Sequence, residues 1–476
     1  MANYLASVGM EVHAELRTQT KMFCRCPVEF GGEPNTRVCP VCLGLPGALP
    51  VPNQQAIQLV LRTALALNCQ IAMHSTFHRK NYFYPDLPKG YQISQYGDTN
   101  PIGFNGYLDL PSGKRVHIRR VHLEEDTGKL IHESDFSGMD FNRAGVPLME
   151  IVTEFPPDIS NSVEAKEYIA LLRQTLIYLG VCDGKMEHGS LRCEPNISIR
   201  ETGSDRFGTK TELKNLASFR AVQLGVQFEV ARQATVLEGG GAVIQETRGW
   251  DESKEASYSM RAKEEENDYR YFPDPDLMPM QFEQNEVDRL RDALPELPVA
   301  KRNRYIQSLG LSDYDADVLT AEVERANYFE EVVAAGIEPK QACNWRKRGL
   351  PLLPNDADES FGASRIAASE LAGLLSMIDS GEISGKIAKQ VLRDMFATGE
   401  SARQVVERKG LTQVSDESAI RLIIQNVIQD NPAAVENYRA GQQNVLGFFV
   451  GQVMKASQGR ANPETVQRLL RELINS

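Results

Sequence analysis

The chain has 476 residues, of which 42% are hydrophobic and 24% charged, and its formal net charge is −12. One hydrophobic core rarely organises this length, so we expect two or three domains, and the acidic balance argues against a surface wholly devoted to nucleic acid. No apolar run approaches the roughly 20 residues that cross a bilayer, and the N-terminus lacks the basic and apolar regions of a secretion signal, so we expect a cytoplasmic protein without membrane contact.

Polar residues are unusually placed in the first segment, residues 9–15 (GMEVHAE). Glu11, His13 and Glu15 alternate with apolar residues, which predicts a strand with these three on one face. Burying such groups is costly unless they are paired or bind a metal. The segment therefore indicates either part of a cation site or an edge strand with one solvated face.

Four of the eight cysteines form two close pairs, Cys24 with Cys26 and Cys39 with Cys42. In a reducing compartment this spacing is typical of a tetrahedral zinc site, and four thiolates leave no position for a catalytic water. We expect the zinc to hold a loop and to do no chemistry. The remaining four are predicted to be buried reduced thiols: Cys69, Cys182, Cys193 and Cys343.

Helical and strand patterns alternate up to about residue 290, which predicts an α+β fold for this part of the chain. Apolar residues recur at helical spacing in residues 53–68 and 161–179, and alternating runs at 115–119 and 196–200 predict strands. Residues 79–86 (RKNYFYPD) bring two cations beside three aromatic rings, which suits a phosphate or an adenine ring.

A second acidic segment is residues 119–129 (RRVHLEEDTGK), in which three adjacent carboxylates follow a histidine. Together with the first strand it predicts a divalent-cation site of the kind that handles phosphates. Residues 189–196 and 210–215 offer further cations. Three glycines at 239–241 join a predicted helix to a strand, and a tight turn is favoured there over a phosphate-cradling loop.

The pattern becomes almost wholly helical after residues 272–276 and 295–298. Ser312 or Asp313 is expected to cap one helix, and a polar patch at 396–402 marks a boundary before a last small helical unit. Residues 403–476 of that unit hold nine Lys/Arg against seven Asp/Glu, so this part is mildly basic within an acidic chain. The buried face of the capped helix is predicted to carry Ala316, Leu319, Val323 and Ala326.

The common glycine-rich nucleotide-binding motifs are absent from the sequence. It contains no G-x-x-x-x-G-K-[ST] and no strand-linked G-x-G-x-x-G. If ATP is used, its phosphates must be held by carboxylate-bound Mg²⁺ and by scattered basic side chains. No activated Ser or Cys nucleophile motif is evident either, so covalent hydrolytic catalysis is not expected.

Several long motifs occur in a fixed order along the whole chain: GMEVHAEL, RKNYFYPD, HLEEDTGK, EHGSLRCEPNIS, KTELKNL, DYRYFPDPD and GFFVGQVMKASQGRANP. In this the chain resembles the B subunits of the tRNA-dependent amidotransferases, GatCAB. The resemblance implies a glutamine-synthetase-like catalytic cradle over residues 1–295, with a zinc loop at 24–42. It further implies an all-α helical domain over 296–402 and a YqeY-like helical tail over 403–476 that contacts tRNA.

The resemblance also implies an activity, a carbon–nitrogen ligase that takes its nitrogen from glutamine. Such a protein uses ATP and Mg²⁺ to phosphorylate the side-chain carboxylate of misacylated Glu-tRNA(Gln) or Asp-tRNA(Asn). Ammonia from a GatA glutaminase subunit then displaces phosphate, and a small GatC subunit supports the pair in a heterotrimer. The missing nucleophile motif fits this division of labour. The cognate aminoacyl-tRNA synthetase is a further expected partner.

Carried onto this sequence, the resemblance implies three sets of site residues. The Cys24, Cys26, Cys39 and Cys42 quartet falls where many family members carry zinc and others lack it. Contacts to phosphate or carboxylate are expected from Lys80, Ser190, Arg192 and Lys210, with Tyr82 beside the nucleotide. The implied Mg²⁺ ligands are Glu11, His13, Glu125 and Glu150, with Glu124 as a catalytic neighbour.

Two other classes of protein remain to be weighed. A non-catalytic tRNA-binding scaffold has no use for clustered like charges such as those at Glu11 and Glu124. A free-standing ligase of the glutamine synthetase type has no need of the helical tail. ATP hydrolysis that depends on misacylated tRNA distinguishes the three classes.

Overall fold

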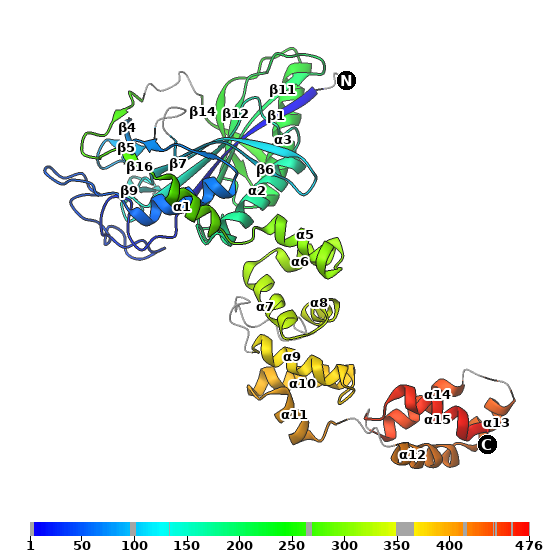
Figure 1. Ribbon diagram of the computed structural model, residues 1–476. Helices are drawn as coiled ribbons and strands as arrows, with labels where there is room; N and C mark the ends of the chain where they lie inside the picture. The colour runs from blue at the N-terminus through cyan, green and yellow to red at the C-terminus, as the bar shows by residue number, and fades with distance from the viewer. Residues whose placement is uncertain are drawn as a thin grey trace. The chain divides into compact units, whose positions relative to one another are not determined.

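The computed structural model describes residues 4–95, 101–132, 134–262, 269–348, 366–412, 417–440, 442, 445–457 and 460–475. These residues form fifteen helices and sixteen strands, and the chain divides into two compact units, Met1–Ala300 and Lys301–Ser476 (Figure 1). The mixture of helices with a large sheet confirms the predicted combination of α and β structure. None of the helices in these ranges is long and apolar enough to cross a membrane.

A nine-stranded sheet organises the first unit, in the order β14-β13-β12-β11-β1-β10-β7-β6-β2. The pairs are antiparallel except for β12 with β13, which is parallel. The long first strand therefore lies in the middle of the sheet and not at an edge. The strands are β1 (Tyr4–Glu15), β2 (Gln70–Ile71), β6 (Gly103–Asp109), β7 (Arg115–Glu125), β10 (Pro147–Thr153), β11 (Leu191–Glu201), β12 (Thr211–Lys214), β13 (Glu246–Asp251) and β14 (Ala256–Ala262).

The two faces of this sheet differ in chemistry because successive side chains of a strand point to opposite faces. On β1, Val8, Met10, Val12 and Ala14 are fully buried in the apolar core. Helix α1 packs on β6 and β7, α3 packs on β11, and α2 packs on α3. These helices occupy the apolar side, so the alternate side chains of β1 lie on the other face. The helices are α1 (Gln54–Ala66), α2 (Ser162–Tyr178) and α3 (Phe219–Glu238).

Three small sheets and one helix complete the first unit. The three-stranded sheet β15-β4-β5 brings residues far apart in sequence together, since Phe272 pairs with Arg79. The elements are β3 (His74–Ser75) with β16 (Met280–Gln281), β4 (His78–Asn81), β5 (Tyr91–Ser94) and β15 (Phe272–Pro273), β8 (Lys129–His132) with β9 (Ser137–Asp140), and α4 (Gln284–Asp292).

The structure confirms the helices predicted in the first unit and the tight turn. Helices α1 and α2 begin after Asn53 and Asn161, whose side-chain oxygens accept hydrogen bonds from the first-turn amides. After α3 the amides of Gly240 and Gly241 donate to the carbonyls of Leu237 and Val236. Because the helix end uses these amides, the glycine segment is a turn and does not present them to a phosphate.

The second unit is helical and contains two hydrophobic cores. The first core extends from Tyr305 to Leu411 and the second from Ile420 to Ile474, so the first reaches beyond residue 402. The helices are α5 (Pro298–Leu309), which spans the division between the units, then α6 (Asp313–Thr320), α7 (Val323–Ala334), α8 (Pro339–Arg348), α9 (Ala368–Asp379), α10 (Gly385–Thr398), α11 (Ala402–Lys409), α12 (Glu417–Asp430), α13 (Pro432–Arg439), α14 (Val445–Ala456) and α15 (Pro463–Asn475).

One predicted helix of the second unit is wrong in extent. Ser312 caps α6 as expected, but α6 ends at Thr320 and Val323 begins a separate helix, α7. The hydroxyl of Thr320 donates to the carbonyl of Ala316, an arrangement that often bends helices. Apolar residues on both sides of the break keep one helical period, so the sequence pattern did not reveal it.

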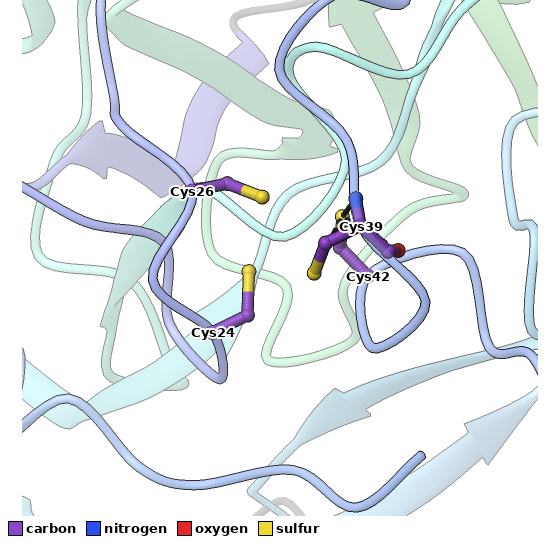
Figure 2. Close-up of side chains that lie close together, drawn as sticks. All are labelled: Cys24, Cys26, Cys39 and Cys42. Atoms are coloured by element: carbon purple, nitrogen blue, oxygen red, sulfur yellow. Dashed lines mark hydrogen bonds between the residues drawn. The ribbon is translucent and has the colours of Figure 1, made fainter. Parts of the chain in front are cut away.

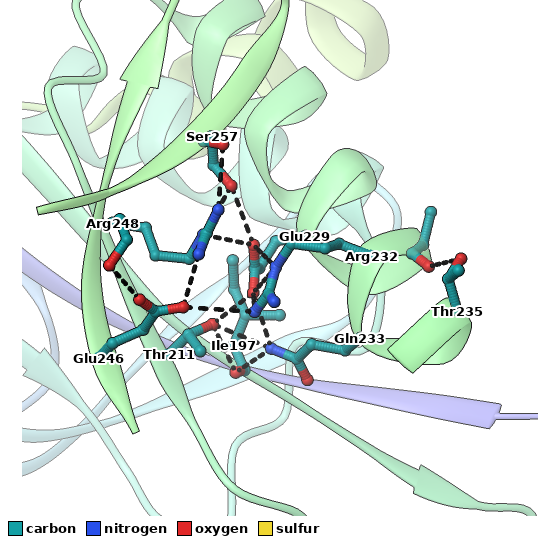
Figure 3. A network of polar contacts seen from close by, with 11 residues as sticks. Ile197, Thr211, Glu229, Arg232, Gln233, Thr235, Glu246, Arg248 and Ser257 are labelled. Atoms are coloured by element: carbon teal, nitrogen blue, oxygen red, sulfur yellow. Dashed lines mark hydrogen bonds and ion pairs between the residues drawn. The ribbon is translucent and has the colours of Figure 1, made fainter. Parts of the chain in front are cut away.

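A buried carboxylate, Glu229, fastens α3 to the edge of the large sheet (Figure 3). Its side chain is inaccessible to solvent and accepts hydrogen bonds from Thr211, Arg232 and Gln233, with Arg248 at 3.5 Å. Burial would raise the pKa of Glu229, but its hydrogen bonds to Arg232 and Thr211 hold the pKa below the usual value. The ionised form is therefore the stabilising one.

We expect Glu229→Leu to destabilise the first unit by about 3 kcal/mol or more, because it removes the buried carboxylate that accepts hydrogen bonds from Thr211, Arg232 and Gln233. Urea unfolding followed by Trp250 fluorescence, in a Trp345→Phe background, measures this. The matched control is Glu255→Ala, which removes a solvent-exposed ion pair with Arg220 and should change stability by about 1 kcal/mol at most.

The same network predicts that the free energy of unfolding falls at acid pH. A depressed carboxyl pKa contributes stability that is complete above the unfolded-state value and is lost as pH falls through the folded-state value. The wild-type chain should therefore lose more unfolding free energy than Glu229→Leu between neutral pH and pH values below the ordinary glutamate pKa. Equal losses in the two proteins would contradict this role for Glu229.

Candidate active site

Five adjacent strands place charged side chains on the polar face of the large sheet. The pairing register sets His13 of β1 opposite Glu150 of β10 and opposite Arg192 of β11. It likewise sets Glu11 opposite Glu194. Segments separated by well over a hundred residues in the sequence thus contribute to one polar surface, and its carboxylates form two groups.

The first group consists of His13, Glu124 and Glu150, whose ligand atoms all lie within 4.8 Å of one another. Nε2 of His13 is 3.6 Å from Glu124 and 3.9 Å from Glu150, and these two carboxylates are only 5% and 12% exposed. Behind them lies His122, a buried residue whose Nε2 is 2.8 Å from an oxygen of Glu150. The donor set of one imidazole and two carboxylates suits a divalent cation.

Charges around this group keep its carboxylates ionised. Burial would raise the pKa of Glu150, but His122 and His13 hold it well below the usual range. Burial would likewise lower the pKa of Lys80, yet Glu124 and Glu150 raise it above the ordinary lysine value. Lys80 also lies 4.9 Å from the centre of the Tyr269 ring and 5.9 Å from that of Tyr82.

The second group consists of Glu11, Glu194 and Glu212, which again lie within 4.8 Å of one another. Nζ of Lys214 is 2.9 Å from Glu194 and 3.3 Å from Glu212, and the Asn196 amide donates to Glu11 at 2.9 Å. Burial, followed by the charges of Glu150 and Glu194, raises the pKa of Glu11. A divalent cation bound beside these carboxylates would favour their ionised form and offset both causes.

Arg192 connects this surface to a neighbouring ion-pair cluster. Its guanidinium is 2.5 Å from the buried carboxylate of Asp126, and Nε of Arg143 lies 3.7 Å from the same oxygen. Burial and the Asp126 charge raise the pKa of Glu15, the last residue of β1, to about 8. The cluster therefore holds two arginines close to a glutamate whose ionisation lies near neutral pH.

Glu125 is not brought into either carboxylate group. It follows Glu124 in β7 and consequently points to the opposite side of the strand. There it receives the Lys89 ammonium at 2.6 Å and the Ile93 amide at 2.9 Å. Its predicted role as a Mg²⁺ ligand stays a prediction, whereas its observed contacts join β7 to β5.

Two further residues of the expected set lie apart from the carboxylate groups. The hydroxyl of Ser190 donates to the carbonyl of Lys185 at 3.0 Å and also to Asp183, in the segment that leads into β11. Lys210 is exposed and immediately precedes β12. Their expected contacts with phosphate or carboxylate stay predictions.

The structure adds four residues to the expected site: His122, Glu194, Glu212 and Lys214. All four lie in segments that the sequence indicated, 119–129, 189–196 and 210–215, but none of them was assigned a role there. A usable signal was present, since each lies two residues from another member of the same face. His122 and Glu124 are such a pair in β7, and Glu212 and Lys214 are another in β12. Polar and apolar residues do not alternate clearly around these four residues, so the strand register is needed to show that they lie on one face of the sheet.

The four paired cysteines converge from two loops of the first unit (Figure 2). Their sulfur atoms all lie within 4.8 Å of one another, and Sγ of Cys42 is 3.9 Å from Sγ of Cys39. Tetrahedral zinc with bonds of about 2.3 Å requires sulfur atoms about 3.8 Å apart. The donors are therefore compatible with one structural zinc ion.

Comparisons with known proteins match the sequence over nearly the whole chain. Residues 6–288 match the family model of the GatB/GatE catalytic domain, and residues 327–474 match the model described as the GatB domain. Proteins named as the B subunit of an aspartyl/glutamyl-tRNA(Asn/Gln) amidotransferase are similar to it. The one from Persephonella marina is 50% identical over 98% of both chains. The one from Brevibacillus brevis is 49% identical over the full length of both, and that from Moorella thermoacetica is 51% identical over 99% of this chain and all of the relative. The chain thus belongs to the GatB family of tRNA-dependent amidotransferases.

Proposed function

We propose that this chain is the subunit that activates and amidates the amino acid in ATP-dependent transamidation of Glu-tRNA(Gln), Asp-tRNA(Asn) or both. The γ-phosphoryl group of ATP is transferred to the side-chain carboxylate, giving an acyl phosphate and ADP. Ammonia then attacks the acyl carbon and inorganic phosphate leaves, which yields Gln-tRNA or Asn-tRNA. The relatives' names state the tRNA specificity of those proteins and support this assignment.

The observation that carries the proposal is the pair of carboxylate groups on one sheet face. His13, Glu124 and Glu150 would hold one Mg²⁺, and Glu11, Glu194 and Glu212 would hold a second. Bound there, Mg²⁺ supplies charge stabilisation to phosphoryl oxygens. The polar face of the large sheet supports the proposal of a glutamine-synthetase-like cradle over residues 1–295.

The chain's own cations are placed to neutralise the two anions that must meet, a nucleotide and a carboxylate. Lys80 lies beside Glu124 and the tyrosine rings, a setting that suits a phosphate with an adjacent base. Arg192 is on the strand next to β1 and carries a fixed planar guanidinium. We assign phosphate contact to Lys80 and carboxylate or phosphate contact to Arg192, with Tyr82 beside the nucleotide.

The ammonia comes from another chain in this proposal. The sequence has no activated nucleophile motif, and the relatives are named as one lettered component of a larger enzyme. We therefore propose that the chain works in the cytoplasm with a GatA glutaminase and a GatC subunit, and engages misacylated tRNA and its cognate aminoacyl-tRNA synthetase. Residues 296–402 would form the helical domain and residues 403–476 the YqeY-like tail.

We expect Glu124→Gln to lower the transamidation rate by a hundredfold or more, because removal of the charge weakens Mg²⁺ binding and the transferring phosphoryl group loses stabilisation. Each 1.4 kcal/mol of lost transition-state stabilisation is about tenfold in rate. The assay follows ATP-dependent conversion of Glu-tRNA(Gln) to Gln-tRNA(Gln) by the assembled enzyme. Glutaminase activity measured without tRNA should survive. Near-normal conversion by this variant would show that the carboxylate groups are structural.

The matched control is Glu125→Gln, which changes the neighbouring residue in the same way. The contacts to Lys89 and Ile93 predict that Mn²⁺ affinity, measured by titration of the free enzyme, stays close to wild type in Glu125→Gln and falls in Glu124→Gln. Loss of Mn²⁺ binding in Glu125→Gln with retention in Glu124→Gln would restore Glu125 as the ligand.

Removal of the last helical core should weaken tRNA binding. Because the preceding core extends to Leu411, truncation after Thr412 avoids cutting α11, which packs on α9 and α10. We expect lower affinity for misacylated tRNA in a filter-binding assay, and a steep fall of wild-type affinity with salt, since phosphate contacts release counterions. Unchanged affinity in the truncated enzyme would exclude a tRNA-binding tail.

The cysteine quartet should bind one zinc ion per chain. Elemental analysis of protein purified without chelator measures the content, and X-ray absorption should give four sulfur ligands at about 2.3 Å. Less than about a tenth of an equivalent, with Cys24 and Cys42 still reactive towards thiol reagents, would exclude a structural zinc ion.

A further inference from the structure

Lys21 is a buried cation beside the cysteine quartet. The residue is 1% exposed and lies just before the first cysteine pair. Its ammonium nitrogen is 3.7 Å from Sγ of Cys42 and 3.1 Å from the carbonyl oxygen of Phe141, and no ion pair joins it to a carboxylate in the described part of the chain. A buried ammonium requires a compensating anion. The sulfur of Cys42 is the group placed to supply it.

The charge of a four-cysteine zinc centre matches this requirement. Four thiolates and one Zn²⁺ carry a net charge of about −2, and such a charge is itself unfavourable in a poorly solvated site. We propose that Lys21 is the counter-cation of the zinc centre, donating a hydrogen bond to the Cys42 thiolate and thereby slowing loss of the metal. The inference rests on the proposed zinc site and assigns a role to a residue outside the four ligands.

The contacts of Lys21 and its neighbour also connect the zinc loop to the segment that leads into β10. Its backbone amide donates to the carbonyl of Cys26, and the next amide, that of Met22, donates to the carbonyl of Gly145. Gly145 has a φ of +87°, and a Cβ there would lie 3.5 Å from Lys21, 3.6 Å from Cys42 and 3.8 Å from Glu125. Lys21, Cys42 and Glu125, the last residue of β7, therefore all lie beside Gly145.

The contact with Phe141 extends this connection. Residues 139–142 are also held by Asn35 of the cysteine loop, whose side chain bonds to the Met139 carbonyl and the Phe141 amide. Arg143 follows directly, and it donates to the carbonyls of Thr127 and Gly128, beside Asp126. Lys21 is thus a positioning residue: its ammonium joins the metal centre to the segment that carries Arg143.

Metal release and spectroscopy of the full-length chain test this role. Removal of an outer-sphere partner of a metal ligand typically weakens binding by about 10- to 100-fold. We expect Lys21→Met to lose zinc to a chromophoric chelator at least about tenfold faster than wild type, whereas Lys21→Arg, which keeps the charge, should resemble wild type. In Co²⁺-substituted protein, Lys21→Met should shift the sulfur-to-cobalt charge-transfer band to lower energy, because the cation no longer stabilises the thiolate electrons.

Lys89→Met is the matched control, since Lys89 and Lys21 line one cavity beside Cys42, but Lys89 pairs with Glu125. It should leave both the release rate and the cobalt spectrum unchanged. Lys21→Gln, a neutral polar variant, gives the same comparison if Lys21→Met does not accumulate as folded protein. Wild-type release and an unshifted band in the neutral variants would overturn the role of Lys21 alone. Absence of zinc from the wild-type chain would overturn the zinc centre and this inference together.

Discussion

The structure depends on accommodating many carboxylates on one face of a sheet whose other face is the apolar core. Val12 and Ala14 of β1 are fully buried against the helices, so Glu11 and His13 have no alternative but the polar face. Successive side chains of a strand point to opposite faces, so the alternation that buries the apolar residues of β1 also gathers its charged residues on the other face. The apolar side supplies the stability on which the charged side depends.

The like charges are balanced in two different ways. The group around Glu150 is balanced by histidines and Lys80, and burial keeps it nearly dry. The group around Glu11 has Lys214 at its rim and retains a raised carboxyl pKa. The polar face therefore carries more carboxylates than its own cations balance. Such a surface is suited to binding a metal ion together with an anionic substrate.

Supporting contacts fix this surface from both ends. Glu229 accepts a hydrogen bond from Thr211 of β12, the strand at one end of the polar face, and lies 3.5 Å from Arg248 of the adjacent β13. At the other end Glu125 joins β7 to Lys89, and Gly145 packs between Glu125 and the cysteine loop. Ligand positions on strands held in this way need little reorganisation when substrate charge arrives, which is how preorganised sites gain rate.

The sequence by itself determined the alternation in β1, the helices α1 and α2, the cap of α6, the cysteine quartet and the family, because each depends on local spacing or on a long contiguous motif. Tertiary structure decided which carboxylates meet. Glu124 and Glu125 are neighbours in sequence and face opposite ways, whereas Glu11, Glu194 and Glu212 are remote and lie together. The physical reason is that strand register, set by pairing of β1 with β10 and β11, is a long-range property that no single segment encodes.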